Sequence, residues 1–255
     1  MPHIDMETGT SRTLDAPDGH LRSLQRYARV GGLLILISFP AALFGEVYVP
    51  SVMSAALSGM VATQGIGSHD VLMRIGFASY LVEAVCDVIL TLIFYVILRP
   101  VEKNVALLIA FFRVASTATF AASEFFYLSA MLYSGGTTYL NKFSAAQLNA
   151  LTRFSFSVYG YGGSAPVFYG TAAVLIGHLI FRSGFLPRAL GILWMVGGLG
   201  QIANTFTLIL APSYAFFWEM IPLLLAILTL ALWLLVRGID IAKWAECDAA
   251  SRLAA

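Results

Sequence analysis

The sequence predicts an all-α fold, a polytopic integral membrane bundle of six transmembrane helices in one domain. Hydrophobic residues make up 59% of the chain and charged residues only 11%, against about a quarter charged in soluble domains. The mean hydropathy is +0.81, and long apolar stretches recur along the chain. A helical bundle in lipid has to be apolar on its outside as well as its inside, which accounts for this composition.

Six stretches are long enough to cross a bilayer, which takes about 20 mostly apolar residues for about 30 Å of hydrocarbon. They are residues 30–49, 71–98, 105–133, 151–181, 189–211 and 214–236. We expect residues 1–25 to form a disordered polar tail and residues 26–240 to form the transmembrane domain. Residues 241–255 are expected to be a cytoplasmic tail.

Prolines and glycines predict where these helices bend. Pro40, Pro166 and Pro222 fall inside spans, where a missing N–H kinks a helix. A helix running through residues 144–181 would be about 55 Å long, which is too long for one span. We therefore expect it to extend outside the membrane, to break at residues 160–166, or both.

Two external connections carry signals of their own. Residues 50–70 are weakly apolar and can hold a short interfacial helix. Ser144 is a candidate N-cap, and Gln147 stands at the position of its capping-box partner. We therefore expect a helix to begin just after Ser144.

The distribution of Lys and Arg predicts the orientation of the spans. One side of the membrane collects Arg12, Arg22, Arg26, Arg29, Arg99, Lys103, Arg182, Arg188, Arg237, Lys243 and Arg252. The other side has only Arg74, Lys142 and Arg153. Cytoplasmic loops carry the excess of positive charge, so both termini are expected to be cytoplasmic.

Several motifs resemble a known family. They are Cys86-Asp87, Leu98-Arg99-Pro100-Val101, Ala110-Phe111-Phe112-Arg113, the block from Phe181 to Arg188 that reads FRSGFLPR, and Leu190-Gly191. On these motifs, which cover most of the chain from about residue 25 to 240, the chain resembles the bacterial membrane proteins called domain of unknown function 4386 (DUF4386). The resemblance implies a multi-pass protein of the bacterial cytoplasmic membrane, and it implies no particular activity.

Ionisable residues inside spans are costly, so they are the first candidates for a functional site. Glu83 and Asp87 lie one turn apart on one face of the second span. Counted from the short turn after that span, Asp87 lies about 16 Å deep and Arg113 of the third span about 14 Å deep. An Asp87–Arg113 pair is therefore expected. Two carboxyls that close disfavour double ionisation, so Glu83 is expected to hold a proton.

The pair allows two interpretations. Asp87 and Arg113 can be a structural lock between helices, or they can belong with Glu83 to a proton- or ion-coupling site. A second group of charges is expected to form an outer polar layer, interpreted as a solvated rim: Glu46, Arg74, Glu124, Arg153 and Glu219. His178 stands near the cytoplasmic end of its span and is interpreted as an interfacial residue rather than a ligand.

Polar residues of the fourth and fifth spans are candidates to line a cavity. They are Tyr159, Tyr161 and Tyr169, which flank a glycine-rich stretch, and Gln201 and Asn204, which lie mid-span. Glycines in this stretch are interpreted either as close helix packing or as part of a broken helix with exposed carbonyls. The two amide side chains are expected to bond to a neighbouring helix or to face the same cavity.

Composition also excludes several classes of function. The formal net charge of +1 argues against a nucleic-acid partner, which requires a basic face. The two cysteines are too few for a disulfide framework or a structural zinc site. We expect no metal and no cofactor, and the chain contains no serine-hydrolase elbow, zinc-protease motif or P-loop.

Three functions are left open by the sequence. The first is binding or conduction of a small ligand or ion through the bundle interior, coupled to protons through Glu83 and Asp87. The second is an intramembrane enzyme acting on a lipid or quinone with the same carboxyls. The third is an accessory or structural protein, with membrane lipids as its surroundings. Transport predicts a path on both sides of the charges, an enzyme predicts a pocket open to lipid or one leaflet, and a structural role predicts a filled interior.

Overall fold

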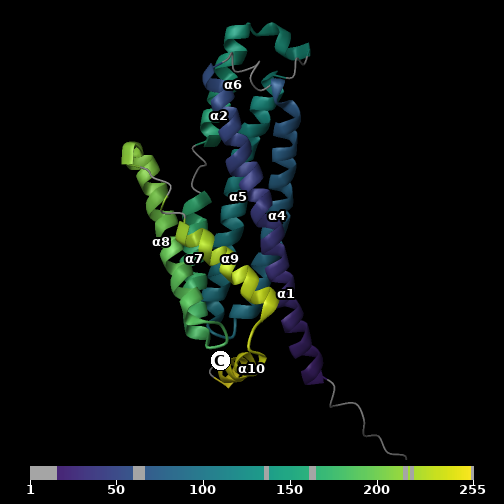
Figure 1. The fold of residues 1–255 in the computed structure, drawn as a ribbon, viewed down its shortest axis with the longest axis vertical. Coiled ribbons are helices and arrows are strands. Elements are labelled where there is room, and N and C mark those ends of the chain that lie inside the picture. The colour runs from purple at the N-terminus through teal and green to yellow at the C-terminus, as the bar shows by residue number, and fades with distance from the viewer. Residues whose placement is uncertain are drawn as a thin grey trace, which may run out of the picture.

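The computed structural model describes residues 16–59, 67–134, 138–160, 165–214, 218 and 221–253. Every regular element in these ranges is a helix (Figure 1). The α-helices are α1 (Ala16–Ala42), α2 (Val49–Gly59), α4 (Asp70–Leu98), α5 (Lys103–Ser134), α6 (Ala145–Gly160), α7 (Ala165–Ser183), α8 (Arg188–Leu210), α9 (Ile221–Val236) and α10 (Ile241–Leu253). A π-helix, η1 (Leu43–Tyr48), joins α1 to α2, and two short 3-10 helices are η2 (Thr138–Lys142) and η3 (Pro212–Tyr214).

Four helical stretches of the described chain are long and apolar enough to cross a membrane. They are Arg22–Ala56, Asp70–Leu98, Lys103–Tyr133 and Arg188–Leu210. A fifth is added if α9 and α10, which are bent by 103° from one another, are counted as one span. The described chain is therefore an all-helical protein with four to five candidate spans, because the expected fourth span is divided between α6 and α7 and α9 has only 16 residues.

The longest helices run along the length of the molecule (Figure 1). α4 packs against both α1 and α5, while α6 packs against α5 at the end opposite to the start of α1. α7 lies beside the other half of α5, α8 packs against α7, and α9 crosses obliquely from α8 to α1. α10 lies across the end of the molecule where α1 begins.

Glycines allow α7 and α8 to pack backbone against backbone. A Cβ on Gly177 would lie 2.5 Å from the Gly191 carbonyl oxygen, and one on Gly198 would lie 2.6 Å from that of Gly170. Gly197 has the same role toward α9, since its Cβ would lie 2.5 Å from the Leu223 Cα. Small residues at these crossings let helices pack closely in a bilayer, where no hydrophobic force draws them together.

The three internal prolines do not act alike. Pro166 and Pro222 are each the second residue of a helix, where their missing N–H costs nothing, so they begin α7 and α9 rather than kinking them as we expected. Pro40 does lie inside α1. The π-helix η1 follows it directly, and the Val49 N–H donates to the Phe44 carbonyl across five residues.

Both ends of the described chain are more ordered than a pair of tails. α1 begins at Ala16, within the segment predicted as a polar tail, and Leu24 and Ala28 of this helix are buried in the core. The Gln25 amide donates to the Arg237 carbonyl at 3.2 Å. In α10, Trp244 is buried and its Nε1 donates to the Ile97 carbonyl at 2.9 Å. The first contact ties α1 to the end of α9, and the second ties α10 to the end of α4.

The start and the end of α6 agree with the features predicted from the sequence. The Ser144 N–H donates to Gln147 Oε1 at 2.8 Å and the Gln147 N–H donates to Ser144 Oγ at 3.3 Å, which confirms the capping box that begins α6. α6 ends at Gly160 and α7 begins at Ala165, which agrees with a break in the predicted fourth span. Residues 50–59 continue the first helix as α2.

Candidate functional site

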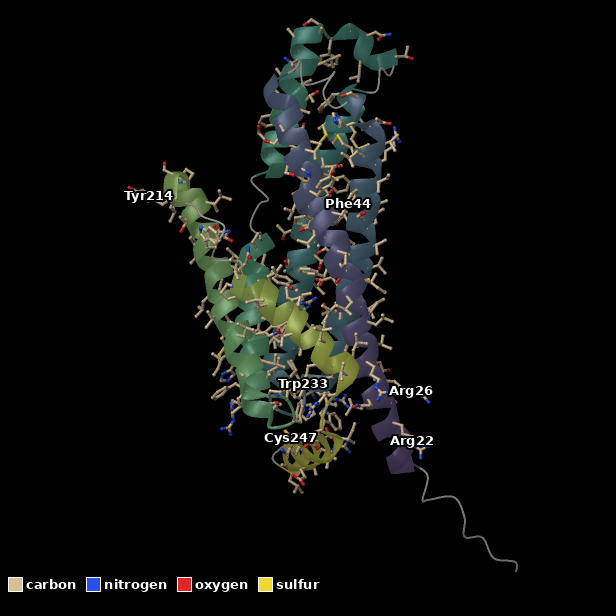
Figure 2. The ribbon with its side chains drawn as sticks, viewed as in Figure 1. Arg22, Arg26, Phe44, Tyr214, Trp233 and Cys247 are labelled. Carbon is tan, nitrogen blue, oxygen red and sulfur yellow. The ribbon has the colours of Figure 1, made fainter. Side chains whose placement is uncertain are left out.

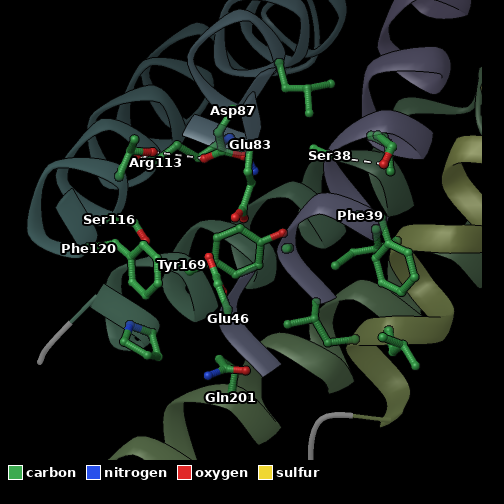
Figure 3. Close-up of a pocket in the computed structure, with 18 of the residues that line it drawn as sticks. Ser38, Phe39, Glu46, Glu83, Asp87, Arg113, Ser116, Phe120, Tyr169 and Gln201 are labelled. Atoms are coloured by element: carbon green, nitrogen blue, oxygen red, sulfur yellow. Dashed lines mark hydrogen bonds and ion pairs between the residues drawn. The ribbon is translucent and has the colours of Figure 1, made fainter. Parts of the chain in front are cut away.

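The bundle contains a cavity of about 330 Å³. α1, η1, α4, α5, α7, α8 and α9 all contribute to its wall, which is largely apolar. Its ionisable lining residues are Glu46, Glu83, Asp87 and Arg113 (Figure 3). The predicted charged cluster therefore lines a single cavity, which is formed by helices that are distant in the sequence.

Asp87 and Arg113 form the ion pair that their depths predict, through Asp87 Oδ1 and Arg113 Nη2. The Thr117 hydroxyl donates to Asp87 Oδ2 at 3.0 Å, so both carboxylate oxygens have partners. Arg113 Nε donates to the Thr91 hydroxyl oxygen at 3.1 Å. A charge pair is stable away from water only when its remaining hydrogen-bonding groups are satisfied as well, and these threonines supply that.

Aromatic rings enclose the Arg113 guanidinium. Its Cζ lies 5.3 Å from the centroid of the Phe94 ring and 5.6 Å from that of Tyr169. A guanidinium at this distance over a ring face is attracted by the ring quadrupole. Arg113 is only 2% exposed, whereas the Asp87 side chain is 19% exposed. The positive member of the pair is thus sealed into the wall, and the negative member borders the cavity.

Glu46 and Glu83 form a second and different cluster. The structure places Glu46 beside Glu83 in the cavity, not in the outer layer where we expected it. The two carboxyl groups are neighbours in the cavity, and they point toward one another in Figure 3. Glu83 Oε2 is buried and has no hydrogen-bond partner among the described residues.

The π-helix η1 explains the position of Glu46. A π turn widens the helix by one residue and changes the direction of the side chains that follow it. Glu46 lies in this segment, four residues before Pro50 and shortly after Pro40. Counting residues along an ideal α-helix places Glu46 at the outer end, but it does not show that the side chain turns inward to Glu83.

The remaining members of the expected outer layer do not form one group. Glu124 is 3% exposed and therefore does not belong to a solvated rim. It lies within hydrogen-bonding range of the Tyr159 hydroxyl. Arg74 pairs with Asp70 at 2.7 Å on the surface instead of with Glu124. Arg153 is exposed on α6, and Glu219 lies outside the described residues.

Only some of the residues that we expected to line a cavity do so. Tyr169 and Gln201 line it. Tyr159 instead packs on Tyr127, with ring centroids 5.1 Å apart, in an aromatic cluster on the α6 side of the cavity. Asn204 is half-buried on α8 outside the lining, and Tyr161 is not among the described residues.

The hydroxyl groups that bond to the Asp87–Arg113 pair were not among the site residues predicted from the sequence. Thr91 lies one turn after Asp87 and Thr117 one turn after Arg113. That spacing could have identified them, because residues one turn apart share a helix face. Serine and threonine are common in transmembrane helices, however, and most hydroxyls here bond to a carbonyl of their own helix, as Thr119 does to Ala115 at 2.7 Å.

The cavity opens between η1 and the start of α9. Its most exposed lining residues are Leu43 and Val47 of η1 and Ile221 and Leu224 of α9, which are between 37% and 44% exposed. α1 and α9 touch at Gly32, where a Cβ would lie 2.7 Å from the Ala231 carbonyl oxygen, and they separate toward the start of α9 (Figure 1). The mouth is therefore a gap between two helices, bordered by apolar side chains.

Toward α10 the bundle is closed. Phe94 and Trp194 meet edge to face at 6.1 Å, and Trp194 Nε1 donates to the Ala226 carbonyl at 3.2 Å. Beyond them a void of about 10 Å³ is lined only by apolar residues. A void of that size is at the lower limit for one water molecule, so the described residues leave no continuous passage to this end.

The model of the family described as Domain of unknown function (DUF4386) matches residues 30–238. The chain belongs to this family. The match confirms the resemblance read from the sequence, and it includes every residue that lines the cavity. An uncharacterized protein of Archaeoglobus fulgidus is 28% identical over 159 residues, which cover 60% of this chain and 78% of the relative. No solved structure matches the DUF4386 chain.

Proposed function

We propose that this protein binds a small, mostly apolar molecule with a polar end inside its transmembrane bundle, and that protons take part in the binding. One observation carries the proposal: a cavity of about 330 Å³ combines apolar walls with a few ionisable groups. Ligand sites have this size range and this mixed lining. A protein whose charges only locked its helices together would have a filled interior, so the cavity argues against a purely structural role.

The proton-binding role belongs to Glu83 together with Glu46. Ionised carboxylates only accept hydrogen bonds, so two neighbouring carboxyls away from water are more stable with a proton between them. Asp87 is unsuitable for this role because Arg113 and Thr117 already satisfy both of its oxygens. The structural lock and the proton site are therefore two neighbouring clusters in this proposal, rather than alternatives for one cluster.

The position of the mouth supports entry from the membrane. A gap between η1 and α9 that is lined by leucine, valine and isoleucine suits an apolar molecule that is already dissolved in lipid. The closed packing around Trp194 separates the cavity from the α10 end. A transporter would have this form in one of its two conformations, open on one side only.

The same mouth favours a second candidate, an intramembrane enzyme that acts on a lipid or quinone. In that case Glu46 and Glu83 would exchange protons with a bound substrate as acid and base. Incubating the purified protein with membrane lipids and quinones, then separating the products by mass spectrometry, distinguishes the two. Turnover that disappears in Glu83→Gln supports the enzyme, and unchanged lipids and quinones support binding or transport.

Filling the cavity tests the principal proposal. Ala84 lines the cavity on α4, whereas Ala78 is exposed on the same helix. Ala84→Phe should remove any small molecule that copurifies with the protein in mild detergent, and Ala78→Phe should retain it. Extraction and mass spectrometry of the two samples give the answer. The proposal fails if no molecule copurifies and Ala84→Phe does not affect the binding of added hydrophobic compounds.

We also propose that the chain crosses the cytoplasmic membrane six times with both termini in the cytoplasm. α6 and α7 would together form the fourth crossing and α9 the sixth. Arg22, Arg26 and Cys247 lie at one end of the molecule and Tyr214 lies far from them (Figure 2), as this orientation requires. The ion pair of Arg182 with Glu102, at 3.2 Å, joins the last turn of α7 to the α4–α5 connection at the basic end.

Reporter fusions test this topology. A reporter that is active only in the cytoplasm should work after Lys103, Arg188 or Lys243. It should be silent after Gly67 or Lys142, because these positions lie at the opposite end of the helices. Activity after Lys142, or silence after Arg188, would contradict six crossings.

A further inference from the structure

The cavity is lined by more acidic than basic groups. Its carboxyl and basic lining residues are Glu46, Glu83 and Asp87 on one side and Arg113 on the other. Arg113 is committed to Asp87, Thr91 and two aromatic rings and is 2% exposed. Glu46 and Glu83 are therefore the groups that remain for a ligand, and neither has a basic partner among the described lining residues.

From this arrangement we infer that the cavity binds a hydrophobic organic cation, an ammonium or phosphonium with an apolar body, which replaces the proton held between Glu46 and Glu83. The inference rests on the proposed function and names the class of its ligand. When the cation binds, one carboxyl O–H bond breaks, the proton passes to water, and the resulting carboxylate faces the ligand charge. The total charge in the cavity is the same before and after the exchange.

The walls suit such a cation. Phe39, Tyr80, Phe120 and Tyr169 line the cavity, and aromatic faces attract cations more strongly when water is excluded. Gln201 supplies an amide oxygen as a further acceptor. The apolar mouth between η1 and α9 admits the body of the ligand from the bilayer.

Other ligand classes fit less well. An anion would find only Arg113 among the described lining residues, and this guanidinium already pairs with Asp87. A bare metal ion would occupy little of a cavity of about 330 Å³, and a hard cation needs six or more oxygen ligands. A neutral molecule would leave the buried Glu83 Oε2 without a charged partner.

The ionisable groups around the exchanging pair come from several helices. Tyr80 and Asp87 belong to α4, Arg113 and Glu124 to α5, and Tyr169 to α7. Tyr159 of α6 approaches through Glu124. The described lining residues of α8 and α9 carry no charge. When Glu124 is ionised, it adds negative potential to the pair, which favours a cation further.

Tetraphenylphosphonium and tetraphenylborate test the inference, because they are similar in size and shape and opposite in charge. We expect the purified protein in neutral detergent to bind tetraphenylphosphonium and not tetraphenylborate in isothermal titration. Replacement of one proton makes the affinity for the cation rise by up to about tenfold per pH unit. Titrations in buffers of different ionisation enthalpy should show release of about one proton per cation bound.

Variants show which carboxyl groups are needed for tetraphenylphosphonium binding and for its pH dependence. Glu46→Gln and Glu83→Gln should each weaken tetraphenylphosphonium binding by about tenfold or more and flatten its pH dependence. Glu246→Gln, which changes an exposed carboxyl of α10, should leave both unchanged. If a variant does not fold, the pH slope and proton release of the unaltered chain still decide the question.

The outcomes separate this inference from the proposed function. Equal binding of tetraphenylphosphonium and the neutral triphenylphosphine oxide, with no pH slope, would overturn the cation assignment and leave ligand binding intact. Tight binding of tetraphenylborate would also overturn it. Absence of binding by all three compounds, together with no effect of Ala84→Phe on copurifying molecules, would remove both proposals.

Discussion

Asp87 and Glu83 are carboxyls one turn apart on the same face of α4, yet their surroundings are opposite. Asp87 has an arginine on one oxygen and a threonine hydroxyl on the other. Glu83 has another carboxyl beside it and a buried oxygen without a hydrogen-bond partner in the described chain. A shift of one turn along a helix therefore separates a satisfied charge pair from an unsatisfied acidic pair. The first cluster has the features of a structural contact, and the second has the features of a site that needs a ligand or a proton.

The largest expected effect comes from breaking the satisfied pair. Arg113→Leu leaves Asp87 without its counter-ion, and Asp87→Asn leaves a buried guanidinium without one. Removing one member of such a pair costs roughly 3–5 kcal/mol of folding free energy. The double variant should recover part of this loss, as measured by thermal unfolding in detergent. Purely additive losses would show that the two side chains do not stabilise each other.

A smaller effect is expected from the hydroxyl that completes this cluster. Thr117→Val keeps the shape of the side chain and removes its hydrogen bond to Asp87 Oδ2, which should cost about 1 kcal/mol. Thr119→Val is the matched control, because its hydroxyl bonds only within α5 to the Ala115 carbonyl. The melting temperature should fall for Thr117→Val and stay nearly constant for Thr119→Val. Equal changes would mean that Thr117 does not support the ion pair.

The smallest expected effect sharpens the comparison most. Glu83→Gln has the shape and hydrogen-bonding groups of a protonated Glu83, so the free energy of unfolding at neutral pH should change by less than about 1 kcal/mol or improve. Asp87→Asn should be far more damaging, although it makes the same chemical change one turn away. Thermal melting of both variants in one detergent compares them directly. Equal losses would mean that Glu83 is ionised and helps to hold Arg113 in a structural triad.

Much of the site was predictable where the prediction depended on distance along a helix. The equal depths of Asp87 and Arg113 below the α4–α5 turn predicted their pairing, because that turn is short and makes the helices antiparallel neighbours. α6 ends at Gly160 and α7 begins at Ala165, where the glycines ahead of Pro166 allowed a break, although residues 161–164 lie outside the described chain. The capping box at Ser144 followed from local spacing. These features depend on hydrogen bonds or helical rise within a few turns of chain.

Other features required the direction in which a side chain points. Glu124 was expected at a solvated rim, but it is buried beside Tyr159 on the helix that packs against α5. The start of α1 was expected to be disordered, but Leu24 is buried in the core and Gln25 bonds to the Arg237 carbonyl far away in the sequence. Nothing near these residues in the chain indicates such partners.

The sequence by itself determined the all-helical class with long apolar helices, the family, and the matched positions of Asp87 and Arg113 along their helices, since composition and a constant rise per residue govern these. Only the tertiary structure decided that Glu46 meets Glu83, that α9 crosses obliquely to leave a mouth, and that the helices enclose a cavity. Depth along an axis is a local property of a helix. The rotation of a helix about that axis depends on the π turn of η1 and on glycine contacts with neighbouring helices, and it decides which charges at one depth face each other.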